Sequence, residues 1–209
     1  MSYKDEQFKL HYISGAELVG KYEFPMLQSV DYIPQTVDVF RTSDMKPRGK
    51  WCHFFVDDYR FNGLWNSFEK YIEQLSYYEG VITTDFSMYS DFPTAMQIWN
   101  CYRNRVLAYY MQARGLKIIP TVSWTDKSSF DWCFDGIPKG SNVAVSTNGC
   151  LSPENRRGYI QGMLALDEMV KPKRIIVVGK QIELDVKAEL IYFESEYQKM
   201  ERLKNGRKK

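Results

Sequence analysis

The chain has 209 residues, of which 44% are hydrophobic and 15% aromatic, and its formal net charge is +2. This length and composition suit one α/β domain over residues 1–209 with a full core, and they exclude a chain that is disordered throughout. The near-neutral charge provides no global basic field for a nucleic acid or an anionic membrane. The sequence has neither the ~18-residue apolar run of a membrane span nor the apolar segment of a signal peptide.

Residues 1–50 are predicted to form a less regular N-terminal arm with one strand at 37–40. From residue 51 onward, predicted strands and helices alternate. Strands are expected at 51–58, 81–86, 117–124, 142–147 and 173–179, and helices at 63–78, 91–115, 127–134, 152–170 and 183–204, before a basic tail at 205–209. Such alternation predicts an α/β fold with a parallel sheet of five to six strands, either open or curled into a small incomplete barrel.

Some residues next to these elements have purely structural interpretations. Pro120 weakens the strand at 117–124, because proline lacks the N–H that a sheet ladder needs, so an edge position or a bulge is expected there. Asp91, Asp126 and Ser152 each precede a predicted helix and are expected to cap its N-terminus.

The long helix after Asp91 is predicted to bury one apolar stripe, formed by Phe92, Ala95, Met96, Trp99, Tyr102, Val106 and Tyr110. The polar residues of QIWNCYRNR (97–105) would then form a solvated face on the opposite side. Arg103 has a second interpretation, in which its guanidinium group reaches a phosphate or a carboxylate of a ligand.

Ligands of parallel α/β sheets bind beyond the carboxyl ends of the strands, so the residues delivered to that edge are candidates for a site. They include acids, hydroxyls and aromatic rings: Asp57, Asp58, Asp85, Ser87, Tyr89, Trp124 and Ser146. Crowding several carboxylates on one edge is costly unless cations, donors or a ligand compensate.

Asp58 and Asp85 are the candidate catalytic pair. One carboxylate can raise the pKa of the other, which suits acid–base chemistry, and only one of Asp57 and Asp58 can face the same layer as Asp85 because side chains alternate along a strand. The same pair could hold Mg²⁺, which prefers oxygen ligands. A structural pairing with Arg60, Arg103 or Arg105 is the third interpretation, and the residues alone do not choose between them.

The sequence gives little support to several other kinds of catalytic, metal or nucleotide-binding site. The chain has only two histidines, and His53 lies early in a predicted strand, away from the candidate edge, so hydrolysis by a serine–histidine–aspartate triad and zinc chemistry are poorly supported. Four scattered cysteines without a CxxC pair disfavour a zinc or redox motif and indicate a reduced, cytoplasmic protein of a bacterial or phage-infected cell. Neither GxGxxG nor GxxxxGK[ST] is present, so no dinucleotide or P-loop fingerprint exists.

Several segments together resemble the bacterial, archaeal and phage family known as domain of unknown function 4417: FFVDDYRFNGLW, GVITTDFSMYSDFPTAMQIWNCYRNR, KIIPTVSW, FDWCFDGIPKGSNVAVSTNG and KRIIVVG. The likeness covers about residues 51–179. It implies a phage or mobile-element context and no activity. Carried onto this chain, the family's shared positions are Asp85, Ser87, Trp124, Phe134, Asp135 and Gly136, with Thr84 where relatives usually have proline.

Three functions are compatible with these residues. The first is an enzyme or binder for a nucleotide, phosphorylated or sugar-like small molecule, with Asp135 and the edge residues among its contacts. The second is a non-catalytic binder that sequesters a nucleotide signal or occupies a host protein. The third, a replication or nucleic-acid accessory factor, is disfavoured by the near-neutral charge. The cofactor is open, with Mg²⁺ as one candidate, and no membrane association is expected.

Overall fold

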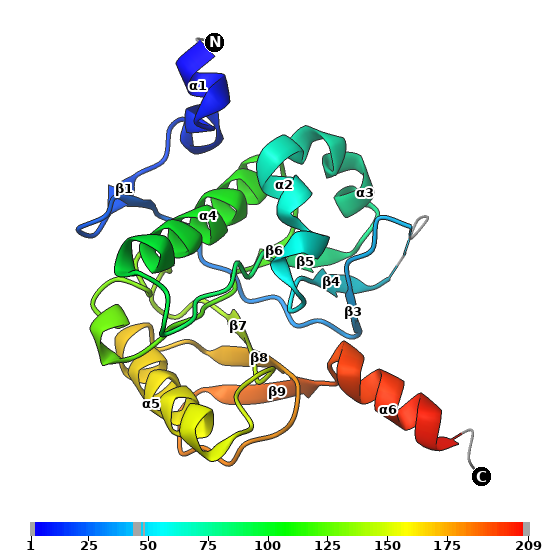
Figure 1. Ribbon diagram of the computed structural model, residues 1–209. Helices are drawn as coiled ribbons and strands as arrows, with labels where there is room; N and C mark the ends of the chain where they lie inside the picture. The colour runs from blue at the N-terminus through cyan, green and yellow to red at the C-terminus, as the bar shows by residue number, and fades with distance from the viewer. Residues whose placement is uncertain (1–2, 44–46, 48, 207–209) are drawn as a thin grey trace.

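Two parallel sheets form the centre of the computed structural model, which describes residues 3–43, 47 and 49–206 (Figure 1). The first sheet contains β3 (Val37–Val39), β4 (Trp51–His53), β5 (Gly80–Ile82) and β6 (Ile118–Ile119), and the second contains β7 (Val143–Ser146), β8 (Arg174–Val178) and β9 (Glu189–Phe193). Within each sheet the strands neighbour one another in chain order. The expectation of a parallel α/β fold is therefore confirmed, whereas a single sheet of five to six strands is not what forms.

A single parallel bridge between Thr121 and Ala144 links the two sheets. The Ala144 N–H donates to the carbonyl of Pro120 at 2.9 Å, and the Val122 N–H donates to the carbonyl of Ala144 at 2.9 Å. Pro120 has no N–H to offer on this side, because its ring replaces the proton. The pairing consequently shrinks to one bridge at the position where the sequence contains proline.

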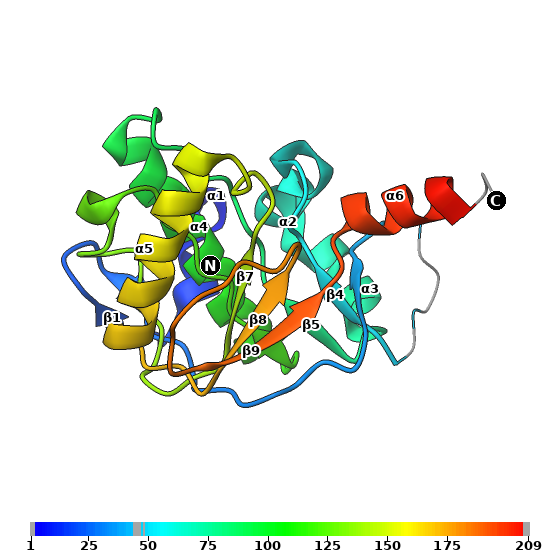
Figure 2. The ribbon, with the colours of Figure 1, turned by 90° about the horizontal axis from the view of Figure 1, so that it is seen from below.

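Helices and 3₁₀ turns follow β4, β5, β6, β7 and β9 (Figures 1 and 2). In chain order they are η2 (Asp58–Arg60), α2 (Asn62–Ser67), η3 (Phe68–Lys70), α3 (Ile72–Ser76), α4 (Thr94–Ala113), η4 (Lys127–Ser129), α5 (Pro153–Met169) and α6 (Glu196–Gly206). The N-terminal arm contains α1 (Tyr3–Gln7), η1 (Leu10–Ile13) and an antiparallel pair, β1 (Leu18–Val19) with β2 (Phe24–Pro25). Of the expected basic tail, residues 207–209 lie outside the described residues.

One apolar cluster contains residues from every strand of both parallel sheets. It consists of Val37, Trp51, Phe55, Ile82, Ile119, Ala144, Ile176 and Val178, with Ile191 and Phe193 packed against it. A larger cluster on the opposite side of the strands contains residues of α2, α4 and α5. Strands β4 to β8 are thus buried on both faces, whereas β9 at the edge is only partly buried.

Several predicted elements differ from the structure. The helix expected at 127–134 is only η4 (Lys127–Ser129), and the strands expected at 51–58 and 117–124 are shortened to β4 (Trp51–His53) and β6 (Ile118–Ile119). The helix expected at 183–204 is strand β9 followed by α6, because the run Leu190–Phe193 is aromatic and β-branched and Ser195 begins a new helix. The Ser195 N–H donates to Gln198 Oε1, and the Gln198 N–H donates to Ser195 Oγ, which is a capping box. The helix expected at 63–78 is split into α2, η3 and α3. Asp91 does not cap α4, whose N-cap is Pro93, whereas Asp126 and Ser152 do cap η4 and α5.

The buried face of α4 agrees only in part with the predicted one: Val106 is buried and Tyr102 and Tyr110 pack against the core, as expected. Trp99 is 46% exposed, while Arg105 is only 1% exposed. The polar residues expected in solvent are buried instead: Gln97, Asn100, Asn104 and Arg105. Their amide and guanidinium groups bind the backbone of neighbouring loops, and this compensates for the loss of hydration that an apolar stripe would have avoided.

Within the part of the chain that the structure describes, no helix is both long enough and apolar enough to cross a membrane.

Candidate functional site

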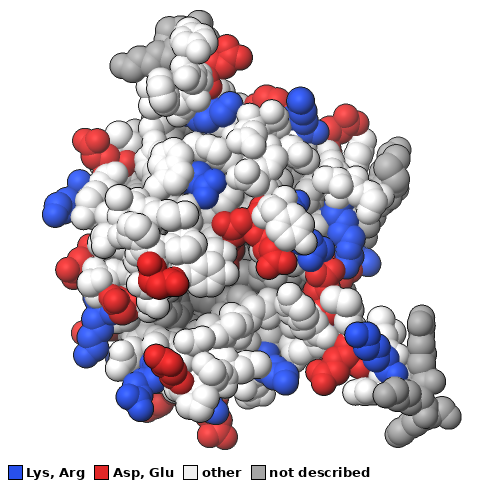
Figure 3. Space-filling view, viewed as in Figure 1, with Lys and Arg blue, Asp and Glu red and all other residues white. Residues whose placement is uncertain are grey.

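The carboxyl ends of β4, β5, β6 and β7 surround a cleft of about 590 Å³. Figure 3 shows a hollow in the middle of this face, with acidic side chains gathered along its border. Segments from four successive strand ends line the cleft, together with the first two turns of α5 and one residue of α6: 55–57, 85, 87–90, 122–126, 145–146, 148–150, 154–155, 158–159 and 197. The expected edge of the sheet is therefore where the described residues form a cavity of ligand size.

Asp85 follows β5 and has an unusual environment for a carboxylate. Its Oδ1 atom is buried and has no hydrogen-bond partner among the described residues. The pKa of Asp85 is raised to about 7, mainly by burial; a hydrogen bond with Ser123 opposes this shift, and the negative charge of Asp58 adds to it. A carboxyl group with a pKa near neutrality can be either a proton donor or an acceptor under physiological conditions.

Tyr159 and Cys150 line the cleft with Asp85. Tyr159 is 4% exposed, and its hydroxyl oxygen has no hydrogen-bond partner among the described residues. Burial is the main cause that raises the pKa of this tyrosine above its ordinary value. Burial also raises the pKa of the Cys150 thiol to about 11, and the nearby charge of Asp85 adds to that shift. Cys150 is therefore a neutral thiol near neutral pH rather than a reactive thiolate.

Trp124 forms one wall and packs directly on α5. Its indole Nε1 donates to the carbonyl of Gly158 at 3.3 Å, and its ring centroid lies 5.9 Å from that of Tyr159. A Cβ on Gly162 would lie 2.0 Å from the indole, so only glycine allows this approach. The absence of a side chain at Gly162 thus sets the position of the wall, and the Gly158 carbonyl binds the indole there.

Asp58 ties the loop after β4 to the loop after β5. Its carboxylate accepts a hydrogen bond from the Ser87 hydroxyl at 2.8 Å and from the Ser87 N–H at 3.1 Å. The carbonyl of Ser87 in turn accepts from Asn100 Nδ2 at 2.6 Å. Asp58 accordingly lies behind the rim and fixes the position of Ser87, which does line the cleft.

The buried polar face of α4 holds the same loops in place. The side chain of Asn104 accepts from the Phe86 N–H at 2.8 Å and donates to the Phe86 carbonyl at 3.3 Å. Gln97 Oε1 accepts from the Thr125 hydroxyl at 2.9 Å. Arg105 donates to the carbonyls of residues 135, 133 and 121 at 2.8, 3.0 and 3.4 Å. The segments on both sides of Asp85 and Trp124 are therefore anchored by one helix.

The structure brings together six of the nine expected site residues. Those that line the cleft are Asp57, Asp85, Ser87, Tyr89, Trp124 and Ser146. Asp58 lies directly behind them. Arg103 and Asp135 lie elsewhere: the guanidinium group of Arg103 stacks 3.6 Å from the centroid of the Phe86 ring, and the Asp135 carboxylate packs against Gly20 of the N-terminal arm.

Several lining residues were not expected from the sequence. Tyr159 and Glu154 come from α5, whose first turns face the cleft, and Tyr197 comes from α6. Glu196 anchors α6 through ion pairs of 2.7 Å with both Arg41 and Arg60. The capping box at Ser195 could have revealed this helix start, but no local pattern indicates that its first turn reaches the cleft.

The structure also shows the environment of His53 and the arrangement of possible metal-ligand side chains. His53 is fully buried, its Nδ1 accepts from the Phe55 N–H, and burial lowers its pKa to about 3, so it is a neutral residue of the sheet interior. Among the described residues, no three His, Cys, Asp or Glu side chains gather where they could share a metal ion.

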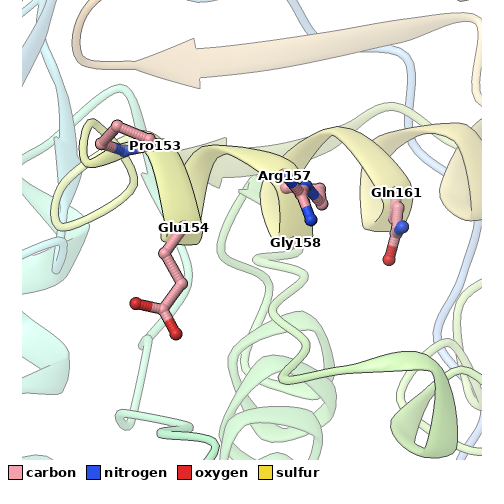
Figure 4. Close-up of a pocket in the computed structure, with 5 residues that line it drawn as sticks. All are labelled: Pro153, Glu154, Arg157, Gly158 and Gln161. Carbon is pink, nitrogen blue, oxygen red and sulfur yellow. The ribbon is translucent and has the colours of Figure 1, made fainter.

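The charge of the lining is one-sided. It contains the carboxylates of Asp57, Asp85, Asp126 and Glu154, and among the described residues that line the cleft none is lysine or arginine. A neighbouring hollow of about 390 Å³ runs along the exposed side of α5, where Arg157 lies one turn after Glu154 (Figure 4). Arg157 lines that hollow and is not among the residues that line the main cleft.

These features define an α/β protein with parallel sheets and a polar, acidic cleft at their carboxyl edge. The chain belongs to the family described as Domain of unknown function (DUF4417), which matches residues 16–197. The match confirms the resemblance seen in residues 51–179 and extends it on both sides.

The curated relatives are phage proteins. The chain is 35% identical over 169 residues to the Gene 1 protein of Mycobacterium phage L5, which covers 78% of this chain and 74% of the relative. It is 33% identical over 164 residues to the Gene 1 protein of Mycobacterium phage D29, covering 76% of this chain and 61% of the relative. No solved structure matches. The chain is thus of a phage type, and these relatives assign it no activity.

Proposed function

We propose that the protein binds a small, ring-bearing molecule in the cleft and that Asp85 exchanges a proton or a hydrogen bond with it. The observation that carries this proposal is the buried Oδ1 atom of Asp85, which has no partner among the described residues in a cleft of about 590 Å³. A native buried polar atom without a partner costs free energy, and a ligand that supplies a donor or acceptor removes that cost.

The surroundings of Asp85 support a small molecule rather than a polymer. Trp124 and Tyr89 offer ring faces, and Ser87 and Ser146 offer hydroxyl groups beside them. Aromatic walls with a few placed polar groups are typical of small-molecule sites. An enzyme would use Asp85, whose pKa of about 7 suits acid–base work on a nucleoside or sugar-like substrate.

The charge of the lining narrows the candidates. A phosphorylated ligand would place its negative charge beside four carboxylates without an arginine or lysine partner among the described lining residues, which is unfavourable in a partly desolvated site. The same argument disfavours a nucleic-acid backbone. Nucleoside and sugar-like molecules without phosphate therefore fit better than the phosphorylated ones.

A non-catalytic binder is the second candidate. The sequence suggested Asp58 as the catalytic partner of Asp85. Asp58 is instead hydrogen-bonded to Ser87 and does not line the cleft, so the expected pair of carboxylates is not available to a ligand. Hydroxyl groups and stacked rings suffice for capture of a nucleoside signal or a side chain of a host protein. Action inside a bacterial or phage-infected cell remains part of this proposal.

We further propose that the two sheets form one incomplete barrel within a single domain. The chain-ordered parallel strands, the bridge at Thr121 and the apolar cluster shared by all seven strands support this arrangement. Ligand sites at the carboxyl ends of the strands are the rule for such barrels.

Native mass spectrometry of the purified protein tests the function. A retained, unmodified small molecule that is lost in Asp85→Asn supports binding, and conversion of that molecule by wild type but not by Asp85→Asn supports an enzyme. Glu168→Gln, on the exposed side of α5, is the control because it removes the same charge outside the cleft. Equal retention or turnover by Asp85→Asn and wild type would contradict the role of Asp85.

A further inference from the structure

The polar groups left open in the cleft indicate the kind of molecule that it holds. We propose that the cleft recognises an organic cation, an amine, amidinium or guanidinium group carried beside a ring, which donates to the Asp85 carboxylate and to the Tyr159 hydroxyl oxygen. This inference rests on the proposed function, because it names the chemical class of ligand for the same cleft.

Among the residues that line the cleft, two carry a buried oxygen atom that can accept a hydrogen bond and has no partner among the described residues. These atoms are Oδ1 of Asp85 and the hydroxyl oxygen of Tyr159, whose side chain is 96% shielded from solvent. They come from different elements, the loop after β5 and helix α5, yet both line the same cleft. A ligand with two or more N–H donors, as amidinium and guanidinium groups have, would satisfy both.

The charges around these oxygens are negative. Asp57 and Glu154 are exposed at the rim, and Asp126 adds a third carboxylate whose oxygen already accepts from the Ser128 N–H at 2.8 Å. The charge of Asp85 also reaches Cys150, where it raises the pKa of the thiol. Such a field concentrates cations and repels anions.

The aromatic residues complete a cation site. Trp124 and Tyr89 line the cleft, and a cation within ~6 Å of such a ring is attracted to its face. Arg156 and Arg157 are the cations closest in sequence to the lining residues of α5; neither lines the cleft, and Arg157 opens onto the neighbouring hollow (Figure 4). Together, the carboxylates and aromatic rings that line the cleft form the combination that recognises amines and guanidinium groups.

Three probes of nearly equal shape separate charge from shape. Benzamidine is a cation, benzamide is neutral and benzoate is an anion, and all three carry the same phenyl ring. Isothermal titration calorimetry with the full-length protein is expected to give benzamidine at least ~tenfold tighter binding than benzamide, since a charge-assisted hydrogen bond contributes about 1.5–3 kcal/mol. Benzoate is expected to show no binding.

Variants locate the binding in the cleft. In Asp85→Asn, benzamidine and benzamide are expected to bind with about equal affinity, because the asparagine amide keeps the shape of the side chain and removes its charge. Tyr159→Phe should weaken benzamidine by about tenfold or less, since it removes one acceptor. Glu168→Gln should leave all affinities unchanged. Circular dichroism of each variant verifies that it is folded.

The pH dependence gives an independent readout. Ser123, Asp58 and Cys150 lie near the Asp85 carboxyl, whose pKa is about 7, and Tyr159 lines the same cleft. A cation prefers the ionised carboxyl, so the affinity for benzamidine should rise from about pH 6 to about pH 8, whereas a ligand that accepts from the protonated carboxyl would show the reverse. Loss of this dependence in Asp85→Asn is expected.

The outcomes distinguish this inference from the proposed function. Benzamide or benzoate binding as tightly as benzamidine, and weakened in Asp85→Asn, would overturn the cation class and keep the cleft as a ligand site. Absence of benzamidine binding would also overturn it. Probe binding that is unchanged in both Asp85→Asn and Trp124→Ala would overturn the inference and the proposed site together.

A last comparison identifies the source of the cation. Tyramine is a free amine beside a ring, whereas N-acetyl-arginyl-phenylalanine amide presents one guanidinium group beside a ring on a polypeptide. Tighter binding of tyramine indicates a free small molecule, and tighter binding of the capped peptide indicates side chains of a protein partner. Binding of neither compound, or binding of both that is unaffected by Asp85→Asn, counts against the cation site.

Discussion

Polar groups at the rim of the cleft are hydrogen-bonded within the protein, whereas one oxygen atom on each of the floor residues, Asp85 and Tyr159, has no partner among the described residues. At the rim, Asp58 accepts two hydrogen bonds from Ser87, and Asn104 binds both backbone groups of Phe86. At the floor, the buried oxygens of Asp85 and Tyr159 have no partner among the described residues. Native proteins satisfy most buried polar atoms, so open acceptors on residues that line a cleft indicate a place where another molecule binds.

The comparison also separates two roles of buried polar residues. Arg105 and the amides of α4 are satisfied by backbone groups, and they stabilise the position of the loops. Asp85 is destabilised by its burial, and its pKa of about 7 is the measure of that cost. Sites of binding or catalysis commonly retain such a cost because function requires the group.

The largest expected effect comes from removing the anchor of the rim. Arg105→Met leaves the three carbonyls that Arg105 binds without their donors, so the free energy of unfolding should fall by about 3–5 kcal/mol. Urea denaturation followed by circular dichroism measures this loss. Arg156→Met, exposed on α5, should change stability by less than about 0.5 kcal/mol. Equal stability of the two variants would show that the polar face of α4 is dispensable.

The wall of the cleft gives the next effect. Gly162→Ala would place a Cβ 2.0 Å from the indole of Trp124, so we expect a loss of about 1–3 kcal/mol and a shift in tryptophan fluorescence. Gly158→Ala is the matched control, because its Cβ would lie 3.9 Å from the nearest heavy atom. That variant should be as stable as wild type or gain up to about 1 kcal/mol from helix propensity. Similar behaviour of both variants would contradict the close approach of Trp124 to α5.

Asp85→Asn should stabilise the protein in a pH-dependent way. The folded-state pKa of Asp85 is about 7, so the folded protein holds a proton that the unfolded chain releases between about pH 4 and pH 7, and wild-type stability falls across that window and is level above it. Asparagine has no proton to lose. The variant should therefore exceed wild type by about 1–3 kcal/mol at pH 8, with a difference near zero at pH 4.

Urea titrations at several pH values check this result, with Glu168→Gln as the surface control. A variant that is less stable than wild type at pH 8, or a difference that does not depend on pH, would mean that Asp85 is well compensated in the folded protein.

The smallest effect sharpens the description of the rim. Ser87→Ala removes the hydroxyl that donates to Asp58 and leaves the N–H bond in place, so a loss of about 0.5–1.5 kcal/mol is expected. Ser90→Ala, exposed on the same loop, should be close to neutral. If Ser90→Ala costs as much as Ser87→Ala, the tie between Asp58 and Ser87 is not what orders the loop.

Local patterns predicted the parts of the fold that depend on local chemistry. Alternating strands and helices indicated parallel strands, and Asp85 and Trp124 were expected at one edge because carboxyl ends of parallel strands meet there. The division into two sheets follows from Pro120, a feature that was visible in the sequence. Tertiary contacts decided the rest: the burial of Arg105 depends on carbonyls some 16 to 30 residues away in the chain, and hydropathy assigned its face to solvent.

The same distinction applies to the candidate site. Asp58, Arg103 and Asp135 belong to plausible motifs, yet each side chain lies behind or outside the cleft because a neighbouring loop or ring engages it. Tyr159 belongs to an ordinary amphipathic helix, and only the approach of α5 to Trp124 brings its hydroxyl to the floor. Whether a polar group is satisfied is a property of the tertiary structure.

A carbon-13 NMR titration of the aspartate carboxyl groups tests the proposed role of Asp85 most directly, and Asp85→Asn identifies the Asp85 resonance. The Asp85 carboxyl is expected to titrate with a pKa of about 7, and benzamidine is expected to lower that pKa. A pKa below about 5 in the free protein, near that of an ordinary exposed aspartate, would contradict this role.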